Sequence, residues 1–269
     1  MATVTAASGR DDPGIDDLGN GVTVPRQVTR VVSLVPSLTE AIAHTAPGLL
    51  VGATAWCSRP VDLDVARVRG TKNPDITTIV SLAPDVVCAN AEENREVDLD
   101  QLRAAGIPVW VTAPATVDAA LVSLERMLRD ACRLDRPEWL TAARATWAAP
   151  YRGPRRSALV PVWRRPWMAV GRETFTGDVL RRLGIDNVLA DHAQRYPRIR
   201  LDEVQPVDLV VLPDEPYPFS PADGPEAFGD TPVVCVSGRH LTWYGPSLVS
   251  ARAVLDAQLS HPVTTPART

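Results

Sequence analysis

The chain lacks a long apolar run, a large number of cysteines and an excess of either charge. Its 28 Lys and Arg residues stand against 32 Asp and Glu residues, so the clustered basic excess of a nucleic-acid binder is missing. No apolar run approaches the roughly 18–20 residues that cross a bilayer, and we expect no membrane insertion. With 45% hydrophobic and 22% charged residues, the composition is that of a folded globular protein.

Cysteine is scarce, and its spacing fits no common site. Cys57, Cys88, Cys132 and Cys235 stand far apart, without the C-x-x-C spacing of zinc and redox motifs. We therefore expect buried free thiols, which fit a reducing compartment. Residues 1–21 are polar and acidic and lack the basic start and apolar stretch of a secretory signal. These features predict a cytoplasmic protein, with a periplasmic or extracellular location only if the true start lies upstream.

Strand-like and helix-like segments alternate along most of the chain. This alternation is typical of α/β folds with parallel sheets. A different pattern, that of a long helix, extends from residue 116 to about residue 148, with a break or kink expected at Pro137. The predicted strands lie at residues 30–35, 49–53, 85–89, 108–112, 157–163, 167–170, 208–212 and 233–236.

The alternation predicts an α/β protein with two Rossmann-like lobes. Each lobe has a central parallel sheet, and one long backbone helix joins the two lobes. A single helical connector of this kind favours only modest closure of the lobes. The predicted parts are a polar N-terminal arm at 1–28, an N-terminal lobe at 29–115, a connecting helix at 116–150, a C-terminal lobe at 151–260 and a tail at 261–269.

Five short segments, in this order, carry a resemblance to a known family. They are R-V-V-S-L-V-P-S-L-T-E at 30–40, L-A-P-D-V-V at 82–87, L-R-A-A-G-I-P-V at 102–109, F-T-G-D-V-L at 175–180 and V-L-P-D-E-P-Y-P-F at 211–219. Together they resemble the helical-backbone metal receptors, the Fe/B12 periplasmic-binding family that serves cobalamin, haem and siderophore importers. The last segment is similar to the cobalamin-binding-like branch. The resemblance covers about residues 29–258 and implies a class III substrate-binding protein, which is not an enzyme.

The resemblance also implies a partner in the membrane. In importer-docking members of the family, an acidic residue on each lobe meets arginines of an ABC permease. Thr77 occupies the corresponding position on the first lobe, so one docking acid is missing, whereas Asp202 or Glu203 is available on the second. An ABC permease is therefore a candidate partner, but the missing acid argues against delivery of a ligand to a permease from outside the cell.

Aromatic and polar side chains follow several of the predicted strands, and seven Trp residues stand against three Phe and four Tyr. In open parallel sheets, ligands bind outside the carboxyl ends of the strands, so these loops are expected to line one cleft between the lobes. Flat aromatic faces with a few polar tips suit a corrinoid, a porphyrin or an aromatic chelate. The predicted ligand-binding residues are Trp56, Arg59, Glu92, Asn94, Arg95, Trp163, Trp167, Tyr217, Phe219, His240, Trp243 and Tyr244.

Each of these residues has a structural alternative. The aromatic side chains can instead pack in the core, and residues 92–95 can cap the helix that begins near Val97. Arg59 can be a solvated surface residue. His240 either approaches the open axial position of a bound metal or has a structural role, and the protein is expected to hold no metal of its own.

Three functions remain from the sequence. The favoured one is reversible, non-catalytic binding of cobalamin, another corrinoid or a metal chelate such as haem or a ferric siderophore, by an intracellular carrier or receptor. The second is the solute-binding subunit of an ABC importer for the same ligands. The third is an enzyme, for which the sequence offers no nucleophile elbow, phosphate loop, dinucleotide fingerprint or zinc-protease helix. No covalently bound cofactor is predicted.

Overall fold

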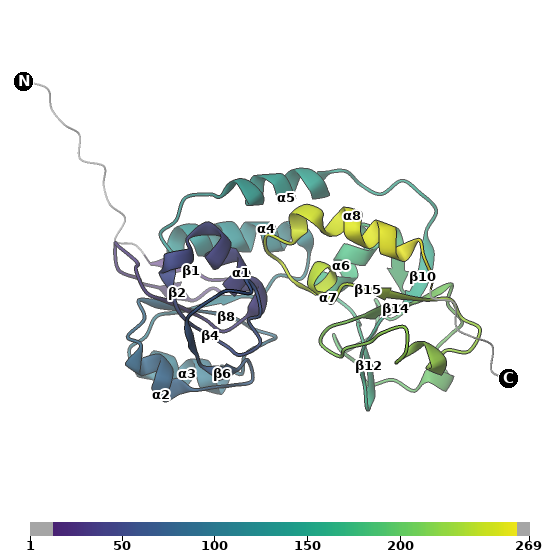
Figure 1. The fold of residues 1–269 in the computed structure, drawn as a ribbon, viewed down its shortest axis with the longest axis horizontal. Coiled ribbons are helices and arrows are strands. Elements are labelled where there is room, and N and C mark those ends of the chain that lie inside the picture. Colours follow the sequence, from purple (N-terminus) through teal and green to yellow (C-terminus); the bar gives the residue numbers. More distant parts are fainter. Residues whose placement is uncertain (1–12, 263–269) are drawn as a thin grey trace, which may run out of the picture. The chain divides into compact units, whose positions relative to one another are not determined.

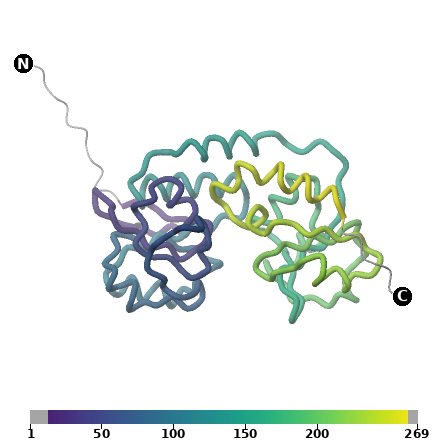
Figure 2. The backbone as a smooth tube through the Cα atoms, viewed as in Figure 1, coloured from purple at the N-terminus to yellow at the C-terminus, as the bar shows by residue number. Residues whose placement is uncertain are grey.

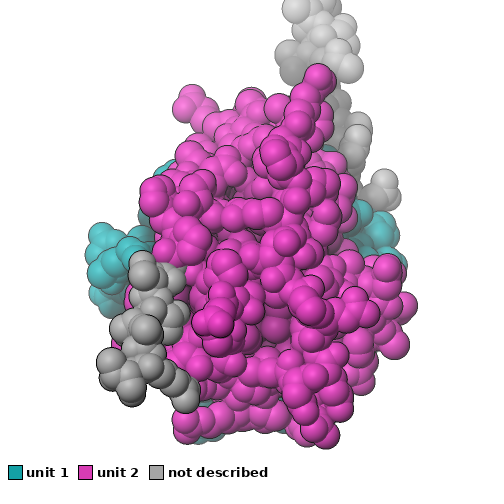
Figure 3. Space-filling view, turned by 90° about the vertical axis from the view of Figure 1, so that its right-hand side faces the viewer, with its two compact units in different colours: residues 1–113, 123–137 teal, residues 114–122, 138–269 magenta. Residues whose placement is uncertain are grey.

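The structure, a computed structural model, describes residues 13–262, so parts of the predicted arm and tail lie outside the described residues. The chain divides into two compact units (Figure 3). The first consists of Met1–Ala113 and Ser123–Pro137, and the second of Pro114–Val122 and Glu138–Thr269. Two of the three divisions between the units, those after Val122 and Pro137, fall inside the segment that the sequence predicts as a connecting helix.

The first unit is built on a parallel sheet in the order β5-β4-β3-β8-β9, of which β4 and β8 are labelled in Figure 1. Residues of β8 are buried on both faces of this sheet, as expected when helices cover both sides. One face packs on α2 and α3, where Val87, Leu102 and Val109 belong to one apolar cluster. The strands and helices of this sheet are β3 (Val31–Ser33), α1 (Pro36–Thr45), β4 (Leu50–Ala53), β5 (Ala66–Arg67), α2 (Ile76–Ser81), β8 (Val86–Asn90), α3 (Glu96–Ala104) and β9 (Val109–Thr112).

Short elements complete the first unit. A hairpin of β1 (Gly14–Ile15) and β2 (Gly21–Val22) occupies part of the predicted polar arm. The Asp17 carboxylate in its turn accepts hydrogen bonds from the Ala113 N–H (2.8 Å) and the Ser123 hydroxyl (2.6 Å), and it forms an ion pair with Arg126. The hairpin is therefore held on the rest of the unit. The remaining short elements are η1 (Pro47–Leu49), β6 (Arg69–Gly70) and β7 (Asn73–Pro74).

The helical stretch between the two sheets consists of two helices where the sequence predicted one. The α4 helix (Val117–Arg126) continues into a π-helical turn, η2 (Met127–Ala131), and α5 (Glu138–Ala148) begins after a non-helical segment. Arg133 has a φ of 56°, a left-handed conformation that ends a helix, and Pro137 directly precedes α5. The break expected at Pro137 is present, and the two helices replace the single long connector.

The second unit contains a four-stranded parallel sheet in the order β13-β10-β14-β15. In Figures 1 and 2, α5 runs beside α8, and Trp147 Nε1 donates a hydrogen bond to the Leu248 carbonyl (3.0 Å) at their contact. The elements of the unit are β10 (Arg156–Leu159), β11 (Pro161–Arg164), β12 (Trp167–Ala169), α6 (Phe175–Arg181), β13 (Ile185–Asn187), η3 (Leu201–Glu203), β14 (Leu209–Pro213), η4 (Pro225–Ala227), β15 (Val233–Val236), α7 (Gly238–Thr242) and α8 (Leu248–Leu259).

One predicted strand is divided. The sequence suggested a single strand at 157–163, but β10 ends at Leu159, and β11 pairs with β12 as a separate antiparallel hairpin. Pro161 begins β11, and because proline has no N–H for the central ladder, the chain leaves the parallel sheet at that point. The predicted α/β architecture with parallel sheets is otherwise confirmed. No helix within residues 13–262 combines the length and apolar character that a bilayer crossing requires.

Candidate ligand-binding surfaces

Four of the predicted aromatic residues form one cluster in the second unit. Trp163 and Trp167 come from the β11–β12 hairpin, and Tyr217 and Phe219 come from the segment that follows β14. Trp163 meets Tyr217 edge to face, with ring centroids 5.7 Å apart, and Tyr217 lies 4.6 Å from Phe219. Phe219 stacks on Trp167 at 6.0 Å with an angle of 5° between the rings. The structure therefore brings these four residues together.

Charged groups fix the loop beside this cluster. The Arg164 guanidinium lies 5.7 Å from the centre of the Trp167 ring and forms ion pairs with Asp223 and Glu226. Burial by itself would raise the pKa of Glu226, but hydrogen bonding to backbone N–H groups and to Arg164 outweighs it and leaves the pKa below its usual value. The Tyr217 hydroxyl donates to Asp223 Oδ2 at 2.7 Å. The aromatic cluster is thus held in one arrangement.

The four rings differ in how much surface they offer to a ligand. Phe219 is 3% exposed and belongs to the apolar core of the unit, on which Trp167 and Tyr217 also pack. Trp163 is 42% exposed. Because stacking on a flat ligand needs an accessible ring face, Trp163 is the member of the cluster best placed to contact one.

Three predicted residues that follow β15 contact other side chains of the same unit. They are His240, Trp243 and Tyr244. Trp243 is buried, and its Nε1 donates to Glu215 Oε2 at 2.9 Å. Tyr244 is also buried and meets Phe175 edge to face at 5.6 Å. These contacts favour a packing role for both aromatic side chains.

Both ring nitrogens of His240 have hydroxyl partners. Its Nδ1 lies 2.8 Å from the Ser237 hydroxyl, and its Nε2 lies 3.4 Å from the Ser250 hydroxyl. Binding a ligand's metal would require one of these hydrogen bonds to break, so the geometry favours the structural alternative. Within residues 13–262, no group of three or more His, Cys, Asp or Glu side chains is placed to hold a metal ion.

In the first unit, Trp56 and Arg59 lie in the exposed turn that follows β4. Trp56 is 69% exposed, and a Cβ added to Gly70 would lie 3.3 Å from its Nε1, so the indole lies against this glycine. The turn is supported by Arg67, whose Nη1 donates to the carbonyls of Thr54 (3.3 Å) and Cys57 (3.0 Å). The turn that contains Trp56 is therefore held by hydrogen bonds, and the indole ring is accessible to solvent.

Asn94 and Arg95 are occupied by neighbouring groups. Asn94 Oδ1 accepts from the Asn90 N–H, its Nδ2 donates to the Thr71 carbonyl, both at 2.9 Å, and the side chain is buried. Arg95 binds Asp98 through two hydrogen bonds of 2.8 Å.

The side chains of residues 92–95 were suggested as caps for the helix that became α3, but a different residue binds the N–H groups of this turn. Arg95 is the N-cap residue of α3 and provides no side-chain cap, while Asn90 Oδ1 accepts from the N–H groups of Glu92 (2.8 Å) and Glu93 (3.1 Å). Lys72 donates to the Glu92 carbonyl. These bonds order the turn.

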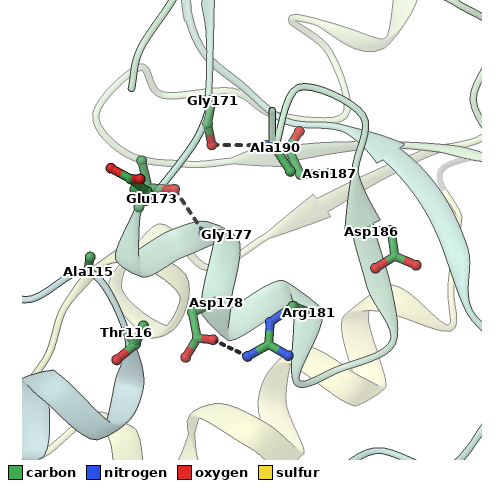
Figure 4. Close-up of a pocket in the computed structure, with 11 residues that line it drawn as sticks. Ala115, Thr116, Gly171, Glu173, Gly177, Asp178, Arg181, Asp186, Asn187 and Ala190 are labelled. Carbon is green, nitrogen blue, oxygen red and sulfur yellow. Dashed lines mark hydrogen bonds and ion pairs between the residues drawn. The ribbon is translucent and has the colours of Figure 1, made fainter. Parts of the chain in front are cut away.

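A cavity of about 320 Å³ lies elsewhere in the second unit (Figure 4). It is lined by the segment before α4, the loop before α6, α6 itself and β13, including Thr116, Glu173 and Asp178, and none of the twelve predicted residues lines it. Asp178 is already bound: its carboxylate accepts from the Val117 N–H (2.9 Å) and pairs with Arg181 (2.7 Å). The sequence analysis missed this loop, where Thr174 caps α6 by accepting from Gly177 N–H.

The candidate docking positions lie on exposed helical turns of the two units. Thr77 is exposed on α2 and supplies no charge. Asp202 and Glu203 are exposed on η3, and both pair with Arg200, at 2.8 Å and 3.2 Å. The first unit therefore lacks the expected acid at this position, and the second presents two.

Comparisons with known proteins provide further findings. No protein-family model matches the chain. The chain is 25% identical over 196 residues to the vitamin B12-binding protein of Yersinia pestis, and the match covers 68% of each protein. Its fold is similar to that of the periplasmic vitamin B12 binding protein BtuF of Vibrio cholerae, with a TM-score of 0.66, 20% identity and coverage of 87% of this chain and 97% of that one.

A haem-binding protein has a similar fold. The periplasmic protein RhuT from Roseiflexus sp. RS-1 matches with a TM-score of 0.67 and 22% identity over 86% of this chain and 97% of that one. These neighbours are two-lobed substrate-binding proteins, as the sequence analysis expected. They are also periplasmic, which contradicts the cytoplasmic location predicted from residues 1–21. That prediction is wrong.

Proposed function

Because the sequence is similar to vitamin B12-binding proteins and the fold to periplasmic binding proteins, we propose that the chain belongs to the Fe/B12 periplasmic-binding family, is the solute-binding subunit of an ABC importer and binds a vitamin B12-like corrinoid outside the cytoplasm. Binding is reversible and non-catalytic. The relatives that match its sequence are named vitamin B12-binding proteins, which favours a corrinoid over haem as the first ligand to test. This role replaces the intracellular carrier favoured by the sequence.

The observation that carries the proposal is the exposed indole of Trp163 on a rigid aromatic base. Trp163 packs on Tyr217, which in turn packs on Phe219, and Arg164 anchors the adjoining loop through Asp223 and Glu226. A ring held in place loses little conformational freedom when a flat macrocycle stacks on it, so more of the contact energy appears as affinity. The arrangement fits a large planar ligand better than a small ion.

Trp56 provides a second accessible indole, on the first unit. Its exposure of 69% is unusual for a tryptophan, since large aromatic residues generally bury most of their surface. The adjacent Arg59 is exposed and offers a guanidinium to carboxylate, amide or phosphate groups on a ligand's periphery. We assign both residues to ligand contact, and we assign Phe219, Trp243 and Tyr244 to support.

A titration tests this function. Purified protein is titrated with cyanocobalamin, cobinamide, haemin and a ferric siderophore, while tryptophan fluorescence and heat are recorded. Saturable one-to-one binding of a corrinoid is expected. Saturation by haemin alone would replace the corrinoid by a porphyrin, and an absence of heat and quenching with all four ligands would refute the binding function.

The docking of a permease is a separate part of the proposal. Asp202 and Glu203 present the exposed negative charge on the second unit that can meet permease arginines, with Arg200 as their present partner. Changing both to Asn and Gln is expected to reduce ligand-dependent stimulation of the importer's ATPase. A matched change of the exposed pair Asp62 and Asp64 on the first unit should leave it unchanged. Equal activity of both double variants would exclude η3 from docking.

A further inference from the structure

The chain contains a single lysine among its 28 Lys and Arg residues, and this lysine belongs to the first unit. Lys72 stands in the turn between β6 and β7, and its side chain is exposed. An ammonium is a compact charge with freely rotating N–H donors, whereas the planar guanidinium of arginine matches carboxylates and phosphates. The turn therefore offers a contact that no other side chain of the protein provides.

Hydrogen bonds hold the hairpin that carries Lys72. The β6 and β7 strands are antiparallel, and Thr71 and Lys72 form the turn between them. The buried Asn94 donates from Nδ2 to the Thr71 carbonyl at 2.9 Å, and the Arg69 carbonyl accepts from the Ala55 N–H at 2.6 Å. The hairpin is thus fixed on the segments that follow β4 and β8.

The same hairpin meets the exposed indole of Trp56. A Cβ added to Gly70 would lie 3.3 Å from Trp56 Nε1, and Gly70 is the last residue of β6, directly before the turn. Ligands of open parallel sheets bind outside the carboxyl ends of the strands. The indole that we assign to ligand contact and the only lysine ammonium therefore lie at the same, carboxyl end of the first unit's sheet.

The Lys72 ammonium is only partly used by the protein itself. It donates to the Glu92 carbonyl, and this is its one hydrogen bond within residues 13–262. Because an ammonium carries more than one N–H donor, the exposed group retains donors for a ligand.

Acidic residues accompany this ammonium. Glu92 supplies the carbonyl that Lys72 binds, and Glu93 directly follows it, so two carboxyl groups belong to the segment that the ammonium contacts. Their charge opposes that of Lys72. The turn therefore has no excess of positive charge that would favour an anionic group on a ligand.

We propose that Lys72 is a specificity-determining contact residue, whose ammonium donates hydrogen bonds to the neutral carbonyl oxygens of amide side chains at the periphery of a corrinoid. This inference rests on the proposed function and deepens it by assigning the chemical group that the first unit recognises. An amide carbonyl accepts a hydrogen bond without placing a further negative charge beside Glu92 and Glu93. The carboxylates of a porphyrin and the phosphate of a nucleotide would be repelled by these residues.

Affinity tests the choice of group. Cyanocobalamin and cobinamide both have amide side chains, but cobinamide lacks the phosphate of the nucleotide loop. Lys72→Met is expected to weaken the binding of both by about 5–30-fold, the effect of losing a hydrogen bond from a charged donor at an accessible site. Arg103→Met removes a charge of the same sign from α3 and should leave both Kd values unchanged. A loss confined to cyanocobalamin would assign the contact to the phosphate and overturn the inference.

Labelling separates ligand contact from a role in holding the turn. Reductive methylation modifies amines, and in this chain its targets are Lys72 and the α-amino group. Saturating cyanocobalamin is expected to slow the methylation of Lys72 several-fold, as measured by peptide mass spectrometry and normalised to the α-amino group. Equal rates with and without the ligand would overturn the inference, because any loss of affinity in Lys72→Met would then come from the missing bond to Glu92.

The inference and the proposed function fail in different ways. Wild-type protein that binds neither corrinoid overturns the proposed function and the role of Lys72 with it. Wild-type protein that binds cyanocobalamin, with an unchanged Kd in Lys72→Met, overturns only the role of Lys72. Thermal melting verifies that Lys72→Met is folded, and a small change in melting temperature is expected because the side chain is exposed.

Discussion

Trp163 and Phe219 belong to one aromatic cluster, but their replacement should have opposite consequences. Phe219 is 3% exposed in the core, so Phe219→Ala is expected to lower the free energy of unfolding by about 3–5 kcal/mol. Trp163 is 42% exposed and contacts Tyr217 by its edge, so Trp163→Ala should cost about 1 kcal/mol or less. If Trp163 stacks on the ligand, its loss weakens binding by about 1–3 kcal/mol, a factor of roughly 5–150 in Kd.

The two effects are measured on the same samples. Urea denaturation gives the stability of each variant, and calorimetry with cyanocobalamin gives Kd. Val249→Ala, an exposed apolar position on α8, serves as the control for surface changes in the second unit. An unchanged Kd in Trp163→Ala, together with a stability loss as large as that of Phe219→Ala, would refute the assignment of Trp163 as a contact residue.

Two further predictions concern stability. The pKa of Asp178 is lowered, because hydrogen bonds from Val117, Arg181 and Arg182 outweigh the opposing effect of burial. The stabilising contribution of the Asp178 carboxylate is therefore complete above the unfolded pKa of about 3.9 and is lost as the pH falls through the lower folded value. Asp178→Asn should lower the free energy of unfolding at pH 7 by about 1–3 kcal/mol. Thermal melts should show a smaller difference between this variant and the wild type at pH 2. Asp17→Ala should release the β1–β2 hairpin, seen as faster hydrogen exchange at residues 14–22, while Leu18→Ala should not.

The fold could be predicted from the sequence to the extent that apolar runs mark buried strands. The segments that became β4, β8, β9, β14 and β15 were all found, because each is a short run of mostly buried apolar residues between turn signals. Membership in a sheet was harder to predict. The run at 157–163 looks continuous, and only the missing N–H of Pro161 explains why β11 leaves the sheet.

The candidate residues could be named from the sequence, but the exposure of their side chains could not. The sequence predicts that aromatic residues line one cleft, and the structure brings Trp163 and Trp167 of the β11–β12 hairpin together with Tyr217 and Phe219. Burial depends on residues distant in sequence, such as the Glu215 carboxylate that binds Trp243. The sequence pattern places an aromatic residue at a strand end but does not say which side of the ring is covered.

Trp56 provides an independent test of ligand contact on the first unit. If its indole stacks on the corrinoid, Trp56→Ala should weaken binding by about 1–3 kcal/mol. Leu18→Ala, an exposed apolar change on the same unit, is the control. Stability should hardly change in Trp56→Ala, because 69% of the side chain is already exposed. An unchanged Kd in Trp56→Ala would remove Trp56 from the contact residues and would mean that its exposure has another cause.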